Sequence, residues 1–167
     1  PNIAHVFDGG ETASGRPYFV MELVRGIRIT DYCDQNHLTT RERIELFIKV
    51  CNAIQHAHQK GIIHRDIKPA NLIRRQTDRK LVLIDFGAVT NQVNTMIAST
   101  DSQTSFTNFA LGTQGFAPPE QMAMRPVYAS DIYAVGVTCL YLLTGSSPKD
   151  IEVDANTGEL LWEKLVE

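Results

Sequence analysis

The side chains best suited to chemistry are concentrated between His64 and Asn71. This segment reads His-Arg-Asp-Ile-Lys-Pro-Ala-Asn, so a carboxylate (Asp66), an ammonium (Lys68) and an amide (Asn71) fall within six residues. A second carboxylate, Asp85, ends the next apolar run and is followed by Phe-Gly. Phosphoryl transfer needs such a set, because an acceptor hydroxyl must be oriented, negative charge must be offset and a divalent ion must be held.

Each of these residues also has an ordinary structural explanation. An isolated Asp is usually a solvated loop carboxylate, an isolated Lys is usually a surface residue, and an Asn often serves as a cap or turn residue. The three types at this spacing, ahead of Asp-Phe-Gly, favour a shared chemical role over three unrelated structural ones.

The composition is that of a globular chain without a strong electrostatic preference. The 167 residues are long enough to bury one sizeable core, and 43% of them are hydrophobic. A net charge of −3 does not favour nucleic acid or an anionic membrane as a partner. We therefore expect neither nucleic-acid binding nor membrane contact from this segment.

Cysteine usage and the ends of the chain bear on location. Cys33, Cys51 and Cys139 are odd in number and lack the spacing of metal ligands, which indicates a reducing, cytoplasmic setting. The longest apolar stretch, 132–143, is too short to span a bilayer. The chain does not begin with Met, so we expect it to be a segment of a longer protein.

Local patterns predict a mixed α+β chain. Strands are expected at 3–8 and 18–22, with Gly9, Gly10 and Gly15 between them, and a second hairpin is expected at 72–74 and 81–84. Helices are expected from Thr30 to about Asn36, from the Thr39–Glu42 capping box to Gly61, and over 130–144 up to Gly145, followed by a turn at 156–158 and an amphipathic piece over 160–166.

Periodicity assigns faces to the two longer helices. The helix over 130–144 is apolar all round and is predicted to be buried on most sides. His56 and His58 lie on different helix faces, so we read neither as a metal ligand. The predicted buried face of the helix that follows Thr39 consists of Ile44, Phe47, Ile48, Cys51, Ile54 and His58.

Residues 88–111 lack periodicity and are predicted to form a mobile loop of functional length.

The motifs together resemble the eukaryotic-like (Hanks-type) serine/threonine protein kinases, and the chain is most similar to their bacterial branch. Besides the two segments above, Ala-Pro-Pro-Glu-Gln at 117–121 and Ser-Asp-Ile-Tyr at 130–133 occur in family order. The resemblance covers nearly the whole chain. It implies a partial protein-kinase-like α+β fold, with the end of the small-lobe sheet and the hinge in 1–24 and an incomplete, mainly helical large lobe in 25–167.

The resemblance assigns roles to the chemical residues. Asp66 would orient the substrate hydroxyl and accept its proton, and Lys68 would offset charge at the γ-phosphate of ATP. Asn71 would brace the loop and, with Asp85, hold Mg²⁺ through oxygen ligands. A lysine two residues after the catalytic Asp implies a protein Ser or Thr hydroxyl as acceptor rather than Tyr.

The resemblance also implies an adenine site at the end of the first hairpin. Met21 falls at the gatekeeper position. The backbone of Glu22 and Val24 would hydrogen-bond adenine, and Ile73 would form the floor of its pocket.

Regulation is implied by the residues around the loop. Arg65, next to the catalytic Asp, would pair with a phosphate on the 88–111 loop, where Ser105 and Thr107 are the expected acceptors and autophosphorylation the expected source. Thr113 would hydrogen-bond the catalytic carboxylate and ammonium.

Structural roles are implied for other motif residues. Asp131 would tie its helix to the backbone of the catalytic loop, and Glu120 would form an ion pair with an Arg expected beyond residue 167. His64 would be a buried structural histidine, stacked in a column with Phe86 and Val6.

Several parts of the family pattern are missing from the sequence. Nothing matches the Gly-rich phosphate loop, the small-lobe Lys or its Glu partner, all of which precede these motifs in the family. We expect the parent protein to be an active kinase and residues 1–167 alone to transfer phosphate poorly or not at all. Two alternatives stay open: a pseudokinase-like interaction module, and a small-molecule phosphotransferase of kinase-like fold, although the latter usually lacks the equivalent of Lys68 and the Pro-Pro-Glu element.

Overall fold

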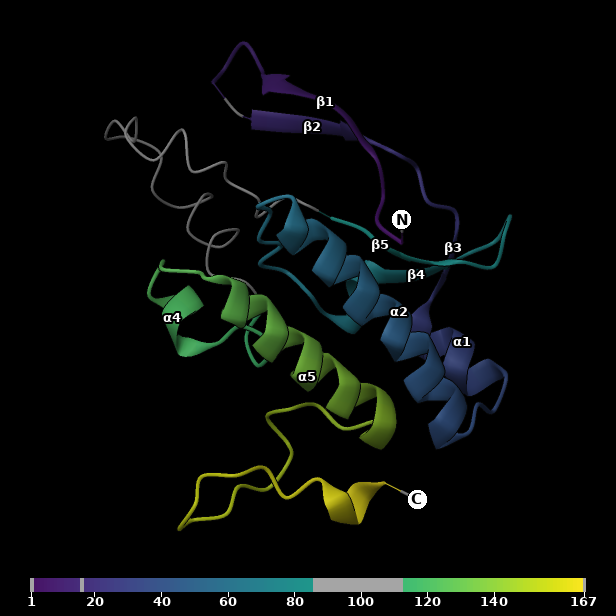
Figure 1. Cartoon of the computed structure of the whole chain (residues 1–167), viewed down its shortest axis with the longest axis vertical. Helices are drawn as coiled ribbons and strands as arrows, with labels where there is room; N and C mark the ends of the chain where they lie inside the picture. The colour runs from purple at the N-terminus through teal and green to yellow at the C-terminus, as the bar shows by residue number, and fades with distance from the viewer. Residues whose placement is uncertain (1, 16, 86–112, 167) are drawn as a thin grey trace.

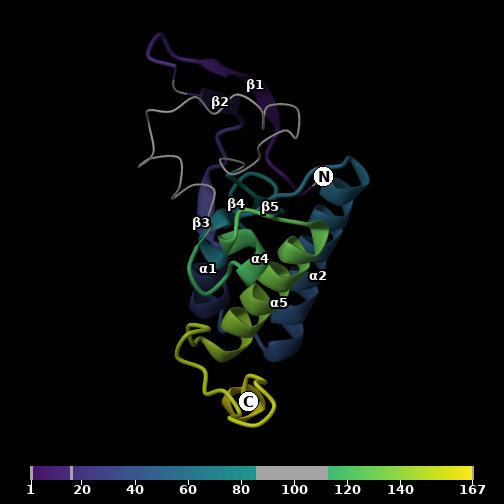
Figure 2. The same cartoon turned by 90° about the vertical axis from the view of Figure 1, so that its left-hand side faces the viewer.

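A computed structural model describes residues 2–15, 17–85 and 113–166 (Figure 1). A β-hairpin lies at one end, a small sheet and two long helices form the middle, and the C-terminal segment lies at the other end in both views (Figure 2). The elements are β1 (Val6–Glu11), β2 (Pro17–Met21), β3 (Gly26–Arg28), α1 (Ile29–Gln35), α2 (Thr40–Gln59), the 3-10 helix η1 (Pro69–Asn71), β4 (Leu72–Arg75), β5 (Leu81–Leu83), α4 (Pro119–Met122), α5 (Tyr128–Thr144) and the 3-10 helix η3 (Glu163–Leu165).

The first hairpin is confirmed, but its strands differ from those predicted. β1 and β2 pair antiparallel from Val6↔Met21 to Glu11↔Pro17, so Gly9 is paired with Phe19 inside the strand rather than placed in the turn. The segment before β1 instead runs beside β5, where the Ala4 amide donates to the Leu83 carbonyl at 2.9 Å. A glycine signals a turn only where the register allows one, and here the register puts the turn further along the chain.

The second sheet has the order β3-β4-β5, and all its pairs are antiparallel. The predicted hairpin of β4 and β5 is confirmed, whereas β3 was not predicted, because a three-residue strand carries little pattern. Gly26 in β3 lies so close to β4 that a Cβ there would be 2.1 Å from the Arg74 carbonyl oxygen. Only glycine permits this approach of two backbones.

α2 begins as predicted and buries a different face. The Thr39–Glu42 capping box is present, and Gly61 follows the helix with φ +75°. The predicted face was wrong for half of its members, since Ile44, Ile48 and Cys51 are exposed. The sequence presents two apolar stripes, and packing selects the one that contains two alanines, where α5 can approach closely. The buried residues of α2 are Leu46, Val50, Ala53, Ile54 and Ala57.

α5 lies beside α2 (Figures 1 and 2). The predicted burial on most sides agrees with the structure, since the exposed residues within 130–144 are Ile132, Tyr133 and Gly136. α5 also carries three buried polar side chains, Ser130, Asp131 and Thr138. Gly145 ends the helix at φ +70°, as predicted. The buried core comprises Ile29, Cys33, Leu46, Val50, Ile54, Ile67, Leu72, Leu81, Leu83, Ala134, Val135 and Leu142.

Two further local predictions can be compared with the structure. Arg28, not Thr30, is the N-cap of α1, and no side chain caps that helix. The predicted turn near residue 156 is confirmed, because the Asp154 carboxylate accepts hydrogen bonds from the amides of Asn156 and Thr157. Within the described ranges, no helix is both long and apolar enough to cross a membrane.

Replacing Gly26 by Ala should destabilise the fold by about 2–3 kcal/mol, because the clash is with backbone that cannot rotate away. Gly136→Ala in α5 is the matched control, since a Cβ there meets nothing within 4 Å and should raise helix stability by roughly 0.5–1 kcal/mol. Urea unfolding of both variants tests this, and equal stabilities would contradict the close approach of β3 and β4.

Candidate active site

The loop that carries Asp66 is anchored by buried side chains on either side of it. His64 and Ile67 are almost completely buried and hold the loop between the end of α2 and η1. Pro69 then opens η1, where its fixed φ suits the first helical position. The short helix brings Asn71 back toward Asp66, so local sequence alone explains why these residues meet.

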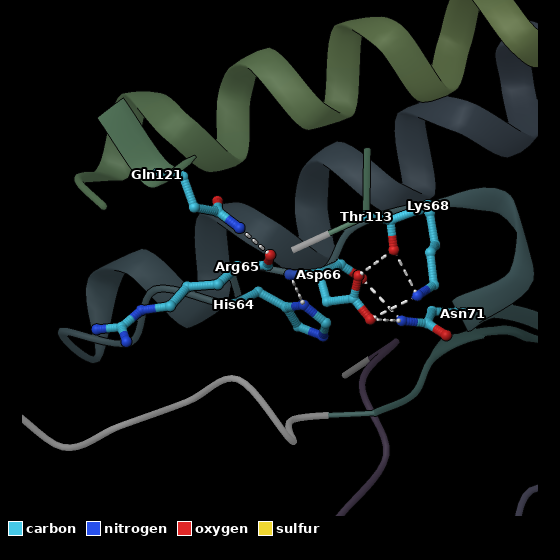
Figure 3. Close-up of polar contacts among 7 residues, drawn as sticks. All are labelled: His64, Arg65, Asp66, Lys68, Asn71, Thr113 and Gln121. Carbon is cyan, nitrogen blue, oxygen red and sulfur yellow. Dashed lines mark hydrogen bonds and ion pairs between the residues drawn. The ribbon is translucent and has the colours of Figure 1, made fainter. Parts of the chain in front are cut away.

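Asp66 is at the centre of a closed hydrogen-bond network (Figure 3). Its Oδ2 accepts from Lys68 Nζ at 2.8 Å and from Asn71 Nδ2 at 2.9 Å, while its Oδ1 accepts from Thr113 Oγ1 at 2.9 Å. Lys68 Nζ also donates to Thr113 Oγ1 at 2.7 Å. The predicted contacts of Thr113 with Asp66 and Lys68 are therefore confirmed.

The network leaves the central carboxylate usable. A carboxylate can accept about four hydrogen bonds, and three side chains donate to Asp66. The side chains of Asp66 and Lys68 remain 16% and 22% exposed. An incoming hydroxyl could therefore reach a lone pair of a carboxylate whose orientation is already fixed.

The backbone of the loop is held by Asp131, as predicted. Its Oδ2 and Oδ1 accept from the amides of His64 and Arg65, each at 2.8 Å, and the carboxylate is fully buried. His58 Nε2 also lies 2.8 Å from Asp131 Oδ2. Sequence reasoning missed His58, because helix periodicity says nothing of which residue a distant segment meets.

Gln121 is a second residue that sequence reasoning missed. It is 1% exposed, and its Nε2 donates to the Arg65 carbonyl oxygen (Figure 3). Its neighbour Glu120 accepts from Ser130 Oγ at 2.7 Å. The Arg expected to pair with Glu120 is not among residues 1–167, so that ion pair stays a prediction. A polar residue next to Pro-Pro-Glu was the one available signal for Gln121.

Burial controls the protonation of His64. Desolvation lowers the pKa of the imidazole, and the charges of Asp131, Asp66 and Asp85 oppose that shift. The Asp66 amide lies 3.3 Å from His64 Nδ1, to which it donates. A neutral, buried imidazole agrees with the predicted structural role. Its predicted stacking partner Phe86 lies outside the described residues, and Val6 is 40% exposed.

The side chain of Arg65 turns away from the Asp66 network, and its guanidinium extends away from the Asp66 carboxylate (Figure 3). Burial lowers its pKa, and the charge of Asp131 opposes that shift. The predicted phosphate acceptors Ser105 and Thr107 lie outside the described residues, so the regulatory role of Arg65 stays a prediction.

Asp85 follows a strand that is tied to Asn71. The Ile84 amide donates to the Asn71 carbonyl at 2.9 Å, which places Asp85 next to η1. Its φ is +67°, in the left-handed region, which Asp adopts more readily than most other non-glycine residues. No cluster of three or more His, Cys, Asp or Glu side chains suited to a metal ion occurs in the described ranges. The predicted pair of one carboxylate and one amide is not of that kind, and it stays a prediction.

The predicted adenine residues lie where β2 leads toward β3. The Glu22 amide donates to the His5 carbonyl at 2.8 Å, so backbone recognition of a ligand by Glu22 would have to use its carbonyl oxygen. Its carboxylate pairs with Arg75, which also binds Asp78 and lowers the pKa of that carboxyl. Arg75 therefore fixes this connection to the β4–β5 turn.

The other adenine residues occupy both sides of this connection. Met21 ends β2, Val24 precedes β3, and Ile73 is half-buried in β4, paired with Arg28. Their contact with a nucleotide stays a prediction.

With the site described, its class can be stated. The sequence matches the family described as "Protein kinase domain" over residues 1–165. The chain belongs to the protein kinase family, and its relatives are bacterial serine/threonine kinases. Both the resemblance and the partial α+β kinase fold expected from the sequence are confirmed.

Individual relatives show how far the similarity extends. The chain is 57% identical over 151 residues to serine/threonine-protein kinase B of Synechocystis, a match that covers 89% of this chain and 26% of that protein. It is 42% identical to PknA of Nostoc, covering 88% of this chain and 26% of the relative. The chain thus spans about a quarter of these relatives.

A solved structure agrees on the fold. The crystal structure of the PknI kinase domain of Mycobacterium tuberculosis superposes with a TM-score of 0.65 at 28% identity. The match covers 89% of this chain and 52% of the solved chain.

The neutral His64 predicts a pH dependence of stability. Because its folded pKa lies below the unfolded value of about 6.5, the unfolded state binds more protons at acid pH. The stabilising effect of a neutral imidazole is present above about pH 6.5 and is lost as the pH falls.

In His64→Asn, whose amide oxygen can still accept from Asp66, the loss of unfolding free energy between pH 7 and pH 5 should be smaller than in the unaltered chain, by at most about 1.4 kcal/mol per pH unit. Urea titrations at both pH values measure the difference. An equal loss in the two proteins would show that His64 is not held neutral.

Proposed function

We propose that the protein containing this chain transfers the γ-phosphoryl group of ATP to Ser and Thr hydroxyls of protein substrates. The observation that supports this most is the Asp66 network, in which Lys68 contacts both the carboxylate and Thr113. Protein kinase relatives at up to 57% identity support the same reaction class.

The proposed mechanism divides the work between two charged side chains. Asp66 orients the substrate hydroxyl and accepts its proton as that oxygen bonds to the γ-phosphorus of ATP and the bond to the β-phosphate oxygen breaks, which releases ADP. Lys68 lies 2.8 Å from Asp66 Oδ2, so its ammonium is held beside the transferred γ-phosphoryl group, whose negative charge it offsets. Thr113 keeps the two side chains in register.

The residues present fit a magnesium ion. Asn71 uses its Nδ2 to bind Asp66, and its amide oxygen points away from that carboxylate (Figure 3). That oxygen and the Asp85 carboxylate are the hard ligands that Mg²⁺ prefers, with waters and phosphate oxygens completing its shell. When bound, Mg²⁺ would neutralise charge on the phosphates.

Further parts of the proposal concern adenine, partners and location. Met21, the Glu22 carbonyl, Val24 and Ile73 would bind the adenine of ATP. The protein itself would be one of its substrates, with Ser105 or Thr107 as acceptor. A cytoplasmic location is supported by the three cysteines, all of which are free thiols.

A direct assay tests the reaction class. Full-length protein is incubated with labelled ATP and Mg²⁺, and transfer to a basic protein is compared with transfer to small alcohols. We expect label in the protein only. Label in small alcohols alone would indicate a small-molecule phosphotransferase, and no transfer with intact nucleotide binding would indicate a pseudokinase.

Loss of Asp66 or Lys68 should act mainly on kcat. We expect Asp66→Asn to lower kcat by roughly 10²–10⁴-fold and Lys68→Ala by roughly 10²–10³-fold. The double variant should resemble the worse single variant, because the two side chains act as a unit. Lys49→Ala on the exposed side of α2 is the control. If Asp66→Asn raised only the KM for ATP, its role would be binding.

Asp85→Asn should abolish Mg-ATP turnover while the fold persists, because the amide cannot supply the charge that holds the ion. Turnover and circular dichroism are compared with those of Asp31→Asn, an exposed carboxylate in α1. Unchanged turnover in Asp85→Asn would refute its assignment as a metal ligand.

A further inference from the structure

The peptide backbone of Arg65 is held from two directions by side chains of distant elements. Its amide donates to Asp131 Oδ1, from α5, at 2.8 Å. Its carbonyl accepts from Gln121 Nε2, from α4 (Figure 3). The backbone amide and carbonyl of Arg65 are therefore both bound by side chains, and not by partners in a helix or a sheet.

This double attachment coincides with an unusual conformation. The φ of Arg65 is +70°, in the left-handed region that favours glycine. Such a conformation costs about 1–3 kcal/mol and persists only where the surroundings enforce it. The Arg65 carbonyl belongs to the peptide that joins Arg65 to Asp66. The orientation of this peptide therefore determines the position of the Asp66 backbone.

Gln121 is firmly placed to make this contact. Its backbone amide donates to the Pro118 carbonyl at 3.1 Å, inside the turn that forms α4. Glu120, beside it, is bound to Ser130 of α5. An apolar side chain could fill the same buried space without the desolvation cost of an amide, so core packing alone gives no reason for Gln here.

We propose that Gln121 is a positioning residue for phosphoryl transfer, which orients the Arg65–Asp66 peptide by donating to the Arg65 carbonyl. The inference rests on the proposed function. Thr113 contacts the Asp66 side chain, so the two ends of the 113–121 segment hold adjacent residues of the catalytic loop. The position of the Asp66 carboxylate therefore depends on the position of the 113–121 segment.

The test compares two substitutions of Gln121 in the full-length protein. Gln121→Met keeps the volume and removes the donor, and Gln121→Glu keeps the shape but opposes a carboxylate to a carbonyl oxygen. Gln55→Met, at an exposed position of α2, controls for the change in side-chain chemistry. We measure kcat, the KM for ATP, the melting temperature and amide exchange of residues 64–66.

The expected result distinguishes an effect on the orientation of the catalytic loop from an effect on the stability of the fold. The kcat of Gln121→Met should fall about tenfold, that of Gln121→Glu by at least as much, and the KM for ATP should change by less than about twofold. The Arg65 amide should exchange faster in both variants, while Gln121→Met keeps its melting temperature.

Three outcomes would overturn the proposal. These are an unchanged kcat, unchanged exchange at Arg65, and a failure of both variants to fold, since Gln121 would then serve the core and not the loop. If the unaltered protein transfers no phosphate, the proposed function fails, but exchange at Arg65 still tests the contact of Gln121.

Discussion

Asp131 places a fully buried carboxylate at the point where α2, α5 and the catalytic loop meet. Burying a charge is costly unless donors surround it, and this carboxylate is bound by two loop amides and lies within hydrogen-bond distance of His58. The same contacts require the three elements to come together. Removing one of these hydrogen-bond donors would leave the buried charge of Asp131 incompletely compensated. The fold and the site therefore depend on the same interaction.

The loop is consequently held by its backbone, and its side chains remain available for chemistry. Asp131 and Gln121 bind main-chain atoms of residues 64 and 65, while Asp66 and Lys68 stay accessible. Fixing the chain in this way supports the left-handed conformation of Arg65. Strain of this kind persists where the surroundings over-determine the backbone, and here it lies beside the residues with chemical roles.

The two sheets contribute to the site in different ways. The β3-β4-β5 sheet packs on the core, and Asn71 and Asp85 lie at the open end of its β4–β5 hairpin. The β1-β2 hairpin extends beyond the helices (Figure 1) and exposes several large apolar side chains. Its attachment to the rest of the chain depends on the strand bridge near Ile3 and on Arg75, which pairs with Glu22.

Features that depend on residues close in the chain could be predicted from the sequence. The capping box of α2, the turn before β5, the stops at Gly61 and Gly145 and the meeting of Asp66, Lys68 and Asn71 each involve residues close in the chain, whose geometry is local. Only the tertiary structure decided which stripe of α2 is buried, because two apolar stripes were available. It also decided that His58 meets Asp131, 73 residues away, and that Gln121 meets Arg65, 56 residues away. Such partners depend on the path of the chain, which no local pattern of residue types records.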